Sequence, residues 1–432
     1  MGLTAKGISA ELERAIHDGT LSPGDPLPSV RSLADQRAVA PGTVASAYKA
    51  LQSRGLVESQ GRRGTFVRQR VTGGGRAASL PVGPEVMDLS RGQPDPALLP
   101  VLPWRSARHR RAAAPTELLL PELVDLAQQR FAADGVPSGP VTVTSGTTDA
   151  IHRVLAARLR PGDIVAVEDP GWPILLDVVA GLGMRVEAVL LDNEGPLPES
   201  LDRVLRAGAS TVVLTPRGQN PTGVEVSAPR SAELRRVLSG FPGVLTVEDD
   251  HSADLINGKL HVVAGATEAW VYARSTSKSY GPDLRVSLLT GDSATISTVQ
   301  EGLRNSGGWV STLLQQLVAD LWTSERAAAC VSSAYDVYSH RRQTLVTELL
   351  KRGVVAQGTS GMNVWVSVPD ETTAVARLLQ AKWLVSPGAR FGRASAPAIR
   401  ITVSGLSARA APRLAADIAL LQADTGPTGY AT

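Results

Sequence analysis

Apolar residues recur at helical spacing near the start of the chain. Ile8, Leu12, Ala15 and Ile16 lie three to four positions apart or adjacent on one face, which predicts an amphipathic helix over residues 4–18. Two more helices and a pair of strands are predicted after it, because capping residues, glycines and prolines mark the ends of such elements over the next fifty positions. Their predicted bounds are residues 30–37 and 41–55 for the helices, and 56–58 and 65–67 for the strands. This order predicts a winged helix-turn-helix, a small α+β domain.

From residue 87 onwards, short apolar runs alternate with helical stretches, which is typical of an α/β fold. Four predicted strands lead into loops rich in polar residues and glycine: residues 141–144, 164–167, 211–214 and 244–247. A further strand is predicted over residues 399–403. Ligands of open α/β sheets bind at the carboxyl ends of strands, so we expect these loops to converge on one site.

Composition fits two or three domains with a substantial core, since 43% of the 432 residues are hydrophobic. The single cysteine excludes an intrachain disulfide and fits a reducing compartment. We expect a cytoplasmic protein without a membrane segment, and the histidine spacing predicts no metal site. The predicted domains are a DNA-binding domain (1–70), a flexible linker (71–86), a large α/β domain (87–425) and a tail (426–432).

Positive charge is concentrated at the N-terminus. Residues 1–70 carry a formal charge of +4 while the whole chain carries +3, which leaves −1 for residues 71–432. A basic domain beside a near-neutral one suggests a polyanion as partner, with a merely solvated basic face as the alternative. Helix residues can enter the major groove, and arginines at the wing tip can reach phosphates. The candidate DNA-binding residues are Ser29, Arg31, Thr43, Ser46, Tyr48, Arg62, Arg63 and Thr65.

Lys278 is the strongest candidate for chemistry. It follows an apolar run, is surrounded by hydroxyl side chains, and has Arg285 seven residues later. A lysine held in a pocket becomes a usable amine nucleophile, and serines with an arginine can bind phosphate. Lys278 is therefore predicted to form a Schiff base with pyridoxal 5′-phosphate (PLP). A surface lysine after a strand is the alternative.

The predicted loops supply the other groups that PLP needs. An acidic side chain can hold the protonated pyridine nitrogen, and backbone N–H groups at a helix start can hold the phosphate. Asp249 is expected at the pyridine, with Asp250 as the fallback, Asn220 and His251 at the ring hydroxyl, and Trp172 on the ring face. The predicted phosphate residues are Gly146, Thr147, Thr148, Ser275, Ser277 and Arg285. Arg400 is expected to bind the carboxylate of an amino compound.

Two parts of the sequence resemble known families. Residues 27–34 (Leu-Pro-Ser-Val-Arg-Ser-Leu-Ala) and 64–67 (Gly-Thr-Phe-Val) are similar to the GntR DNA-binding domain, although Arg63 stands where glycine is usual. Residues 220–223 (Asn-Pro-Thr-Gly) and 275–278 (Ser-Thr-Ser-Lys) resemble the fold-type I aminotransferases of class I/II. Together they resemble the MocR subfamily of bacterial regulators.

The resemblance implies a mixed, mostly parallel sheet with a C-terminal α+β subdomain, and a head-to-tail homodimer. It also implies binding to double-stranded operator DNA with repeated half-sites, a PLP or amino-compound effector, and control of vitamin B6, amino-acid or amine metabolism. His251 departs from the family, which usually has tyrosine there. The segment before Leu123 also lacks the family's tyrosine and arginine, which argues against full transaminase turnover.

Two other functions stay open from sequence. The chain could be a working aminotransferase with an accessory DNA-binding domain, or a DNA-binding protein whose large domain serves only as a dimerisation scaffold.

Overall fold

The computed structural model describes residues 4–17, 20–21, 24–53, 56–59, 64–67, 83–103, 118–392 and 396–423. The predicted wing-tip arginines, Arg62 and Arg63, and most of the predicted linker and tail lie outside these residues. Among the residues that are described, no helix is both long enough and apolar enough to cross a membrane.

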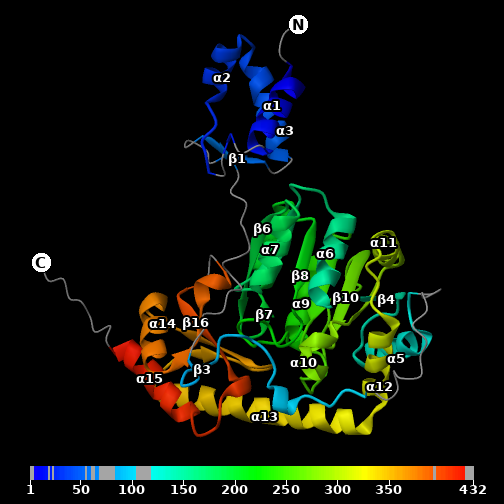
Figure 1. Cartoon of the computed structure of the whole chain (residues 1–432), viewed down its shortest axis with the longest axis vertical. Helices are drawn as coiled ribbons and strands as arrows, with labels where there is room; N and C mark the ends of the chain where they lie inside the picture. Colours follow the sequence, from blue (N-terminus) through cyan, green and yellow to red (C-terminus); the bar gives the residue numbers. More distant parts are fainter. Residues whose placement is uncertain are drawn as a thin grey trace, which may run out of the picture.

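The small domain has the predicted elements (Figure 1). They are α1 (Ala5–His17), α2 (Val30–Arg37), α3 (Pro41–Ser53), β1 (Val57–Ser59) and β2 (Thr65–Val67). Ser29 caps α2, because its side chain accepts a hydrogen bond from the Ser32 N–H. The two strands pair antiparallel, with Val57 opposite Val67. Their buried side chains join those of the three helices in one core, as a winged helix-turn-helix requires.

The large domain is built on an eight-stranded mixed sheet. Its strand order is β4-β11-β10-β9-β8-β5-β6-β7. Neighbours from β10 to β6 pair in parallel, whereas β11 is antiparallel to both of its neighbours and β7 is antiparallel to β6. The strands are β4 (Val141–Thr144), β5 (Ile164–Asp169), β6 (Arg185–Asp192), β7 (Gly195–Pro196), β8 (Thr211–Leu214), β9 (Leu245–Asp250), β10 (Ala269–Ser275) and β11 (Ser287–Gly291).

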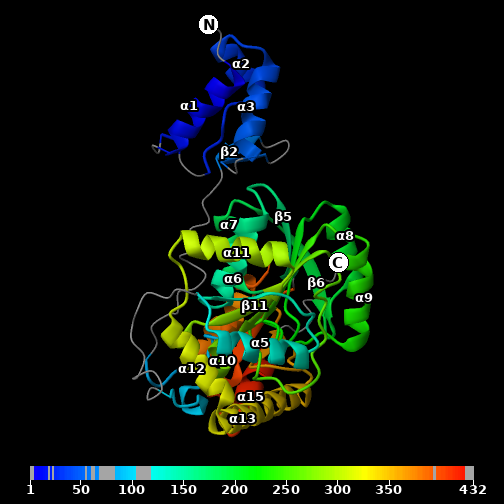
Figure 2. The same cartoon turned by 90° about the vertical axis from the view of Figure 1, so that its right-hand side faces the viewer.

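Helices cover both faces of this sheet. Val165 and Val167 of β5 pack in a cluster with residues of α6 (Thr147–Arg158), α7 (Pro173–Gly181) and α11 (Ser293–Asn305). Ala166, between them, packs instead with α8 (Pro198–Arg206) and α9 (Ala228–Ser239). Successive strand residues point to opposite faces, so these helices lie on opposite sides. Figure 2 shows α8 and α9 side by side along one flank of the domain.

A long helix joins the two parts of the large domain. Helix α13 (Glu325–Leu350) contributes Tyr338 to the core that contains α5 (Pro121–Ala133) and α12 (Thr312–Thr323). Further along, its Leu345 packs in the core of the C-terminal subdomain. Figure 1 shows α13 passing beneath both parts. Because one continuous helix packs in both cores, α13 fixes the orientation of the two parts of the large domain relative to each other.

The C-terminal subdomain is α+β, as expected. Its four-stranded sheet has the order β12-β13-β16-β15, and β14 pairs in parallel with β3 from the start of the large domain. Its elements are β3 (Met87–Asp88), β12 (Ala356–Gln357), β13 (Asn363–Ser367), α14 (Glu371–Gln380), β14 (Trp383–Leu384), β15 (Ser386–Pro387), β16 (Ala398–Thr402) and α15 (Ala411–Ala423). Short 3-10 turns are η2 (Pro96–Leu98), η3 (Pro282–Leu284), η4 (Gly388–Arg390) and η5 (Val403–Gly405).

Two predicted boundaries differ in an informative way. Strand β9 continues through Asp250, so the acidic residues expected in a loop lie at the end of a strand. The sequence after residue 148 predicts a helix from Asp149 to Leu159, but helix α6 begins at Thr147, two residues earlier. Both shifts bring polar side chains onto regular elements, which fixes their directions more tightly than a loop would.

Candidate functional site

The predicted loops and the C-terminal subdomain enclose one cavity of about 550 Å³. It lies where β8, β9 and β10 end, as expected for a sheet of this kind. Most predicted cofactor residues line it: Thr147, Thr148, Trp172, Asn220, Asp249, His251, Ser275, Ser277, Lys278, Arg285 and Arg400. Gly146 is not among the lining residues; it is the N-cap residue of α6 and directly precedes Thr147.

Lys278 lies in the short helix α10 (Ser277–Tyr280), directly after β10. Its Nζ donates to the Gly92 carbonyl at 2.6 Å and to Gln93 Oε1 at 3.3 Å. Burial, reinforced by the nearby Arg400 charge, lowers the pKa of Lys278 to about 8, although Asp249 opposes the shift. The unprotonated fraction of the amine near neutral pH is therefore far larger than that of an ordinary lysine, and the unprotonated amine is the form that acts as a nucleophile.

One corner of the cavity is built to hold an anion. Gly146 is the N-cap residue of α6 and has a φ of 88°, a conformation that favours glycine. A Cβ at Gly146 would come within 3.2 Å of the Arg285 guanidinium. Arg285 Nη2 donates to the Ser145 carbonyl at 2.7 Å. A helix N-terminus with an arginine beside it is a favourable place for a phosphate.

Asp249 and Asp250 have different surroundings. Asp249 lines the cavity, and its Oδ1 is buried without a hydrogen-bond partner among the described residues. Burial raises the pKa of Asp249 to about 7, and the nearby Asp250 and Glu168 charges add to this while a hydrogen bond from Thr147 opposes it. Asp250 instead accepts two hydrogen bonds from Arg217, at 3.0 and 2.7 Å. Of these two carboxylates, only that of Asp249 has an oxygen without a partner among the described residues, and this oxygen can accept a hydrogen bond from a ligand.

His251 and Asn220 lie near this carboxylate. The Nδ1 of His251 is 3.9 Å from Asp249 Oδ2, and burial lowers the pKa of His251 to about 4. The imidazole is therefore neutral at physiological pH. Asn220 Oδ1 accepts from Arg400 Nη1 at 3.1 Å and from Asn363 Nδ2 at 3.4 Å. With its oxygen occupied, Asn220 has its amide N–H groups left to donate.

Arg400 lies in β16, and its side chain lines the cavity. It is buried, donates to the Ser90 carbonyl, and its guanidinium stacks 4.8 Å above the Phe391 ring centre. No acidic side chain in the described ranges forms an ion pair with it, and its Nε has no partner there. Burial lowers the pKa of Arg400 to about 9, and the Arg390 charge adds to this. A buried cation without a counter-ion favours a carboxylate ligand.

Several cavity residues were not predicted from sequence. Gly92 and Gln93 hold Lys278, and Gly92 has a φ of 63° and lies so close to Arg400 that a Cβ would meet its Nη1 at 3.1 Å. Asn363 supports Asn220. These residues come from segments remote from the predicted loops. Gly92 and Gln93 belong to the run Arg-Gly-Gln-Pro-Asp-Pro at residues 91–96, which resembles the entry to the large domain in the MocR subfamily, whereas no pattern in the sequence indicated Asn363.

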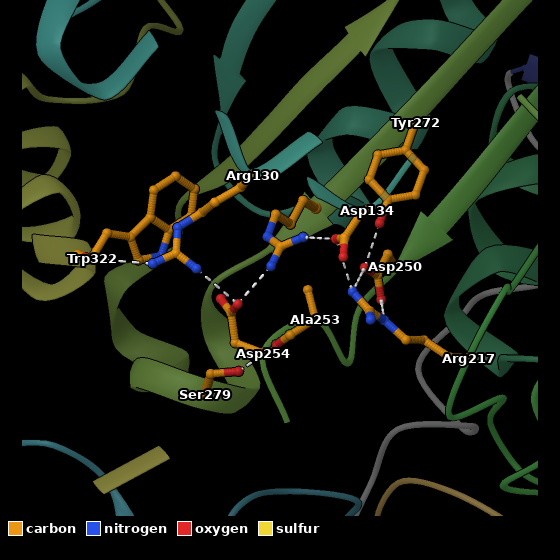
Figure 3. A network of polar contacts seen from close by, with 10 residues as sticks. Arg130, Asp134, Arg217, Asp250, Ala253, Asp254, Tyr272, Ser279 and Trp322 are labelled. Atoms are coloured by element: carbon orange, nitrogen blue, oxygen red, sulfur yellow. Dashed lines mark hydrogen bonds and ion pairs between the residues drawn. The ribbon is translucent and has the colours of Figure 1, made fainter. Parts of the chain in front are cut away.

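Behind the cavity lies a buried cluster of three arginines and three aspartates (Figure 3). Arg217 pairs with Asp250 and, at 3.2 Å, with Asp134. Arg274 of β10 pairs with Asp134 and with Asp254, and Arg130 of α5 completes the cluster at Asp254. Tyr272 donates to Asp250 Oδ2, and Arg130 stacks 4.5 Å above the Trp322 ring centre. Equal numbers of opposite charges allow all six groups to stay ionised within the core.

The small domain presents part of the predicted DNA surface. Ser29, Arg31 and Ser46 are exposed, and Thr43 and Thr65 are half-buried. Tyr48, in contrast, is buried in the core, where its hydroxyl donates to the Pro28 carbonyl at 2.7 Å. The structure thus gives Tyr48 a packing role in place of the exposed position that DNA contact requires.

The fold and the cavity define a class of protein: a winged helix-turn-helix joined to a fold-type I aminotransferase-like domain. The chain is similar to a kynurenine aminotransferase from Pyrococcus horikoshii, with a TM-score of 0.71 at 18% identity over 79% of this chain and 92% of that chain. It is likewise similar to an archaeal alanine:glyoxylate aminotransferase, with a TM-score of 0.70 at 20% identity over 79% and 91%. These likenesses show the fold.

Residues 84–418 match the family described as aminotransferase class I and II, and residues 4–67 match bacterial regulatory proteins of the gntR family. The chain is 39% identical to the vitamin B6 salvage pathway transcriptional repressor PtsJ of Salmonella typhimurium, over 96% of this chain and 98% of that protein. It is 30% identical to the pyridoxine biosynthesis regulator PdxR of Corynebacterium glutamicum, over 57% and 56%. The chain therefore belongs to the MocR subfamily of GntR-type transcription regulators.

Proposed function

We propose that this regulator binds PLP in the described cavity and that PLP, or its adduct with an amino compound, changes how the chain binds an operator. The observation that carries the proposal is the unpartnered Oδ1 of Asp249 in the cavity that also holds the Lys278 amine. A buried carboxylate with a free acceptor fits a protonated pyridine nitrogen. The relative's role in vitamin B6 salvage supports PLP control of genes for that pathway.

The chain's own residues divide the work of binding. Lys278 would attach the cofactor covalently, and Gly146, Thr147, Thr148, Ser275, Ser277 and Arg285 would hold its phosphate. Asp249 would keep the pyridine nitrogen protonated, which makes the ring an electron sink. Asn220 and neutral His251 would hydrogen-bond the ring hydroxyl, and Trp172 would cover one ring face. Arg400 would orient the carboxylate of an amino compound.

Coupling to DNA requires that the ligand bind two arrangements of the protein with different affinity. We infer a homodimer that places two winged domains on repeated operator half-sites, because one such domain reads only a short stretch of sequence. Ligand-dependent rearrangement of the large domains would then change the spacing of the two DNA-binding surfaces. The effect on DNA would appear as altered affinity, footprint or bending.

The test is an operator titration with and without PLP, using the full-length protein and Lys278→Ala. We expect PLP to alter the affinity, footprint or DNA bending of the wild-type protein and to have no effect on the variant. The visible absorbance band of lysine-bound PLP should be lost in the variant. An operator response that is identical with and without PLP would contradict the sensing role.

A working aminotransferase is the second candidate. The Arg400 guanidinium, which has no carboxylate partner among the described residues, and the lowered pKa of Lys278 are features that turnover would also use. Steady turnover of an amino donor with a 2-oxo acid at roughly 1 per second or above would favour this function. A single half-reaction that stops after one equivalent would favour the sensor.

A further inference from the structure

Two arginines face the cavity from the C-terminal subdomain. Arg390 ends the turn η4, and Arg400 lies in the middle of β16; both line the cavity. The Nε atom of each guanidinium is buried and lacks a hydrogen-bond partner within the part of the chain that the structure describes. Buried N–H donors are seldom left unsatisfied in folded proteins. Neither guanidinium therefore has its full set of hydrogen-bond partners within the described part of the chain.

An acid beside η4, Glu371, already accepts two backbone hydrogen bonds. Glu371 accepts the Ala389 N–H at 2.8 Å through Oε2 and the Ala398 N–H at 3.1 Å through Oε1. It ties η4 to the start of β16. No ion pair between Arg390 and an acidic residue occurs within the described ranges, which leaves the charge of Arg390 uncompensated by this carboxylate.

Charges around the cavity are unbalanced. Asp249 is the only acidic side chain among the described lining residues, against Arg91, Lys278, Arg285, Arg390 and Arg400. Arg91 is paired with Asp88 at 2.6 Å. Lys278 and Arg285 have roles toward the cofactor. Once those are assigned, Arg390 and Arg400 remain, and an amino compound with one carboxylate would neutralise only one of them.

The two guanidinium groups also affect each other. The Arg390 charge lowers the pKa of Arg400 beyond the larger effect of burial, and burial lowers the pKa of Arg390 itself. Like charges that are partly removed from water are unfavourable together unless anions are brought between them or beside them. A ligand with two acidic groups would relieve this repulsion at both arginines.

We propose that Arg390 is a specificity-determining residue which, together with Arg400, selects an amino compound carrying two acidic groups, as a dicarboxylic amino acid does. One carboxylate binds Arg400 and the second binds Arg390. The inference rests on the proposed function, because it names the chemical class of the amino compound at that site. It also predicts which close analogues are rejected.

The experiment compares isosteric pairs. Full-length protein loaded with PLP is titrated with L-aspartate and L-asparagine, and with L-glutamate and L-glutamine, while the cofactor absorbance is followed to equilibrium. A charge-assisted hydrogen bond to an otherwise unpaired arginine is worth on the order of 10-fold or more in affinity. We expect at least one acidic member to bind about that much more tightly than its amide.

Two variants assign the preference to Arg390. Arg390→Gln should abolish the difference between acid and amide while still binding the amide, and Arg390→Lys should restore part of it. Arg91→Gln is the matched control, because Arg91 also lines the cavity but is already paired, so the preference should persist. Equal affinities for acid and amide in the wild-type protein, or a preference that survives Arg390→Gln, would overturn the inference.

Calorimetry on the cofactor-free protein separates this inference from the proposed function. If no visible band forms with PLP, the proposed function fails, and calorimetric titration of the same amino acids still reports whether the two arginines prefer two acidic groups. A band without any acid-over-amide preference has the opposite meaning: PLP binding stands and the assigned role of Arg390 is wrong.

Discussion

Asp249 and Asp250 are neighbours in β9, yet one carboxylate faces the cavity and the other is held by Arg217 in the buried charge cluster. Burial raises the pKa of Asp249, whereas for Asp250 the charge and hydrogen bonds of Arg217 outweigh burial and lower the pKa. Strand alternation separates the two side chains onto opposite faces. Asp249 is therefore placed to bind a ligand, whereas Asp250 stabilises the fold. Replacement by asparagine should affect ligand binding at Asp249 and stability at Asp250.

Asp249→Asn should weaken PLP binding by on the order of 10-fold or more, because a neutral amide no longer stabilises a protonated pyridine nitrogen. The protein should remain folded, since Oδ1 of Asp249 has no partner to lose among the described residues. Absorbance titration with PLP measures the affinity, and circular dichroism checks the fold. Affinity equal to that of the wild-type protein would remove Asp249 from the cofactor site.

The stability of the cofactor-free protein should depend on pH through the same residue. The pKa of Asp249 is about 7 in the folded protein, above its ordinary value near 4. The folded state therefore holds a proton that the unfolded state releases, and this contribution is full below about pH 4 and lost as the pH rises through 7. Denaturant unfolding at several pH values should show wild-type stability falling relative to Asp249→Asn across that window.

Arg400 should influence how Lys278 reacts, even though the two side chains have separate roles. Burial is the main cause of the lowered pKa of Lys278, and the Arg400 charge is the second. Arg400→Gln removes that charge, so the pKa should rise above about 8 and PLP should attach with a pH midpoint shifted upward. The pH dependence of the rate of band formation gives this midpoint. Arg91→Gln serves as a control, and an equal shift there would point to a general effect of cavity charge.

Removing one member of the buried charge cluster should be costly. Arg217→Ala leaves Asp250 ionised and without its main partner in the core, which should lower the free energy of unfolding by about 3–5 kcal/mol. Arg206 pairs with Asp202 at 2.6 Å on the surface, where water screens the charges, so Arg206→Ala should change stability little. Denaturant unfolding compares the two variants. Similar losses in both would mean that the cluster contributes no more than a surface pair.

Arg31 should contact DNA phosphate. It is exposed at the start of α2, whereas Arg37 at the end of the same helix pairs with Glu11 at 2.5 Å. Loss of one phosphate contact reduces the slope of log affinity against log salt by about 1. We expect this reduction in slope for Arg31→Ala, and for Arg62→Ala or Arg63→Ala at the predicted wing tip, with a smaller reduction for Arg37→Ala. Operator titrations at several salt concentrations measure the slope. An unchanged slope in a variant would exclude a phosphate contact by the arginine that was replaced.

The sequence alone determined the elements and much of the chemistry. Helix caps, apolar periodicity and turn residues act locally, so the small domain and the strands before each polar loop could be predicted within a few residues. The lysine after an apolar strand, the acidic pair and the arginine in the C-terminal strand were recognisable because each sits in a distinctive local setting.

Only the tertiary structure decided which of these side chains meet. Gly92 reaches Lys278 across 186 positions, and Arg400 reaches Asn220 across 180. Such contacts follow from how α13 and the sheet bring distant segments together, which no local pattern encodes. The same packing buries Tyr48 and commits Asp250 to Arg217. It also leaves Arg390 and Arg400 facing one cavity without an ion-pair partner among the described residues. Local sequence fixes conformation, whereas burial and charge pairing depend on neighbours that only the folded chain supplies.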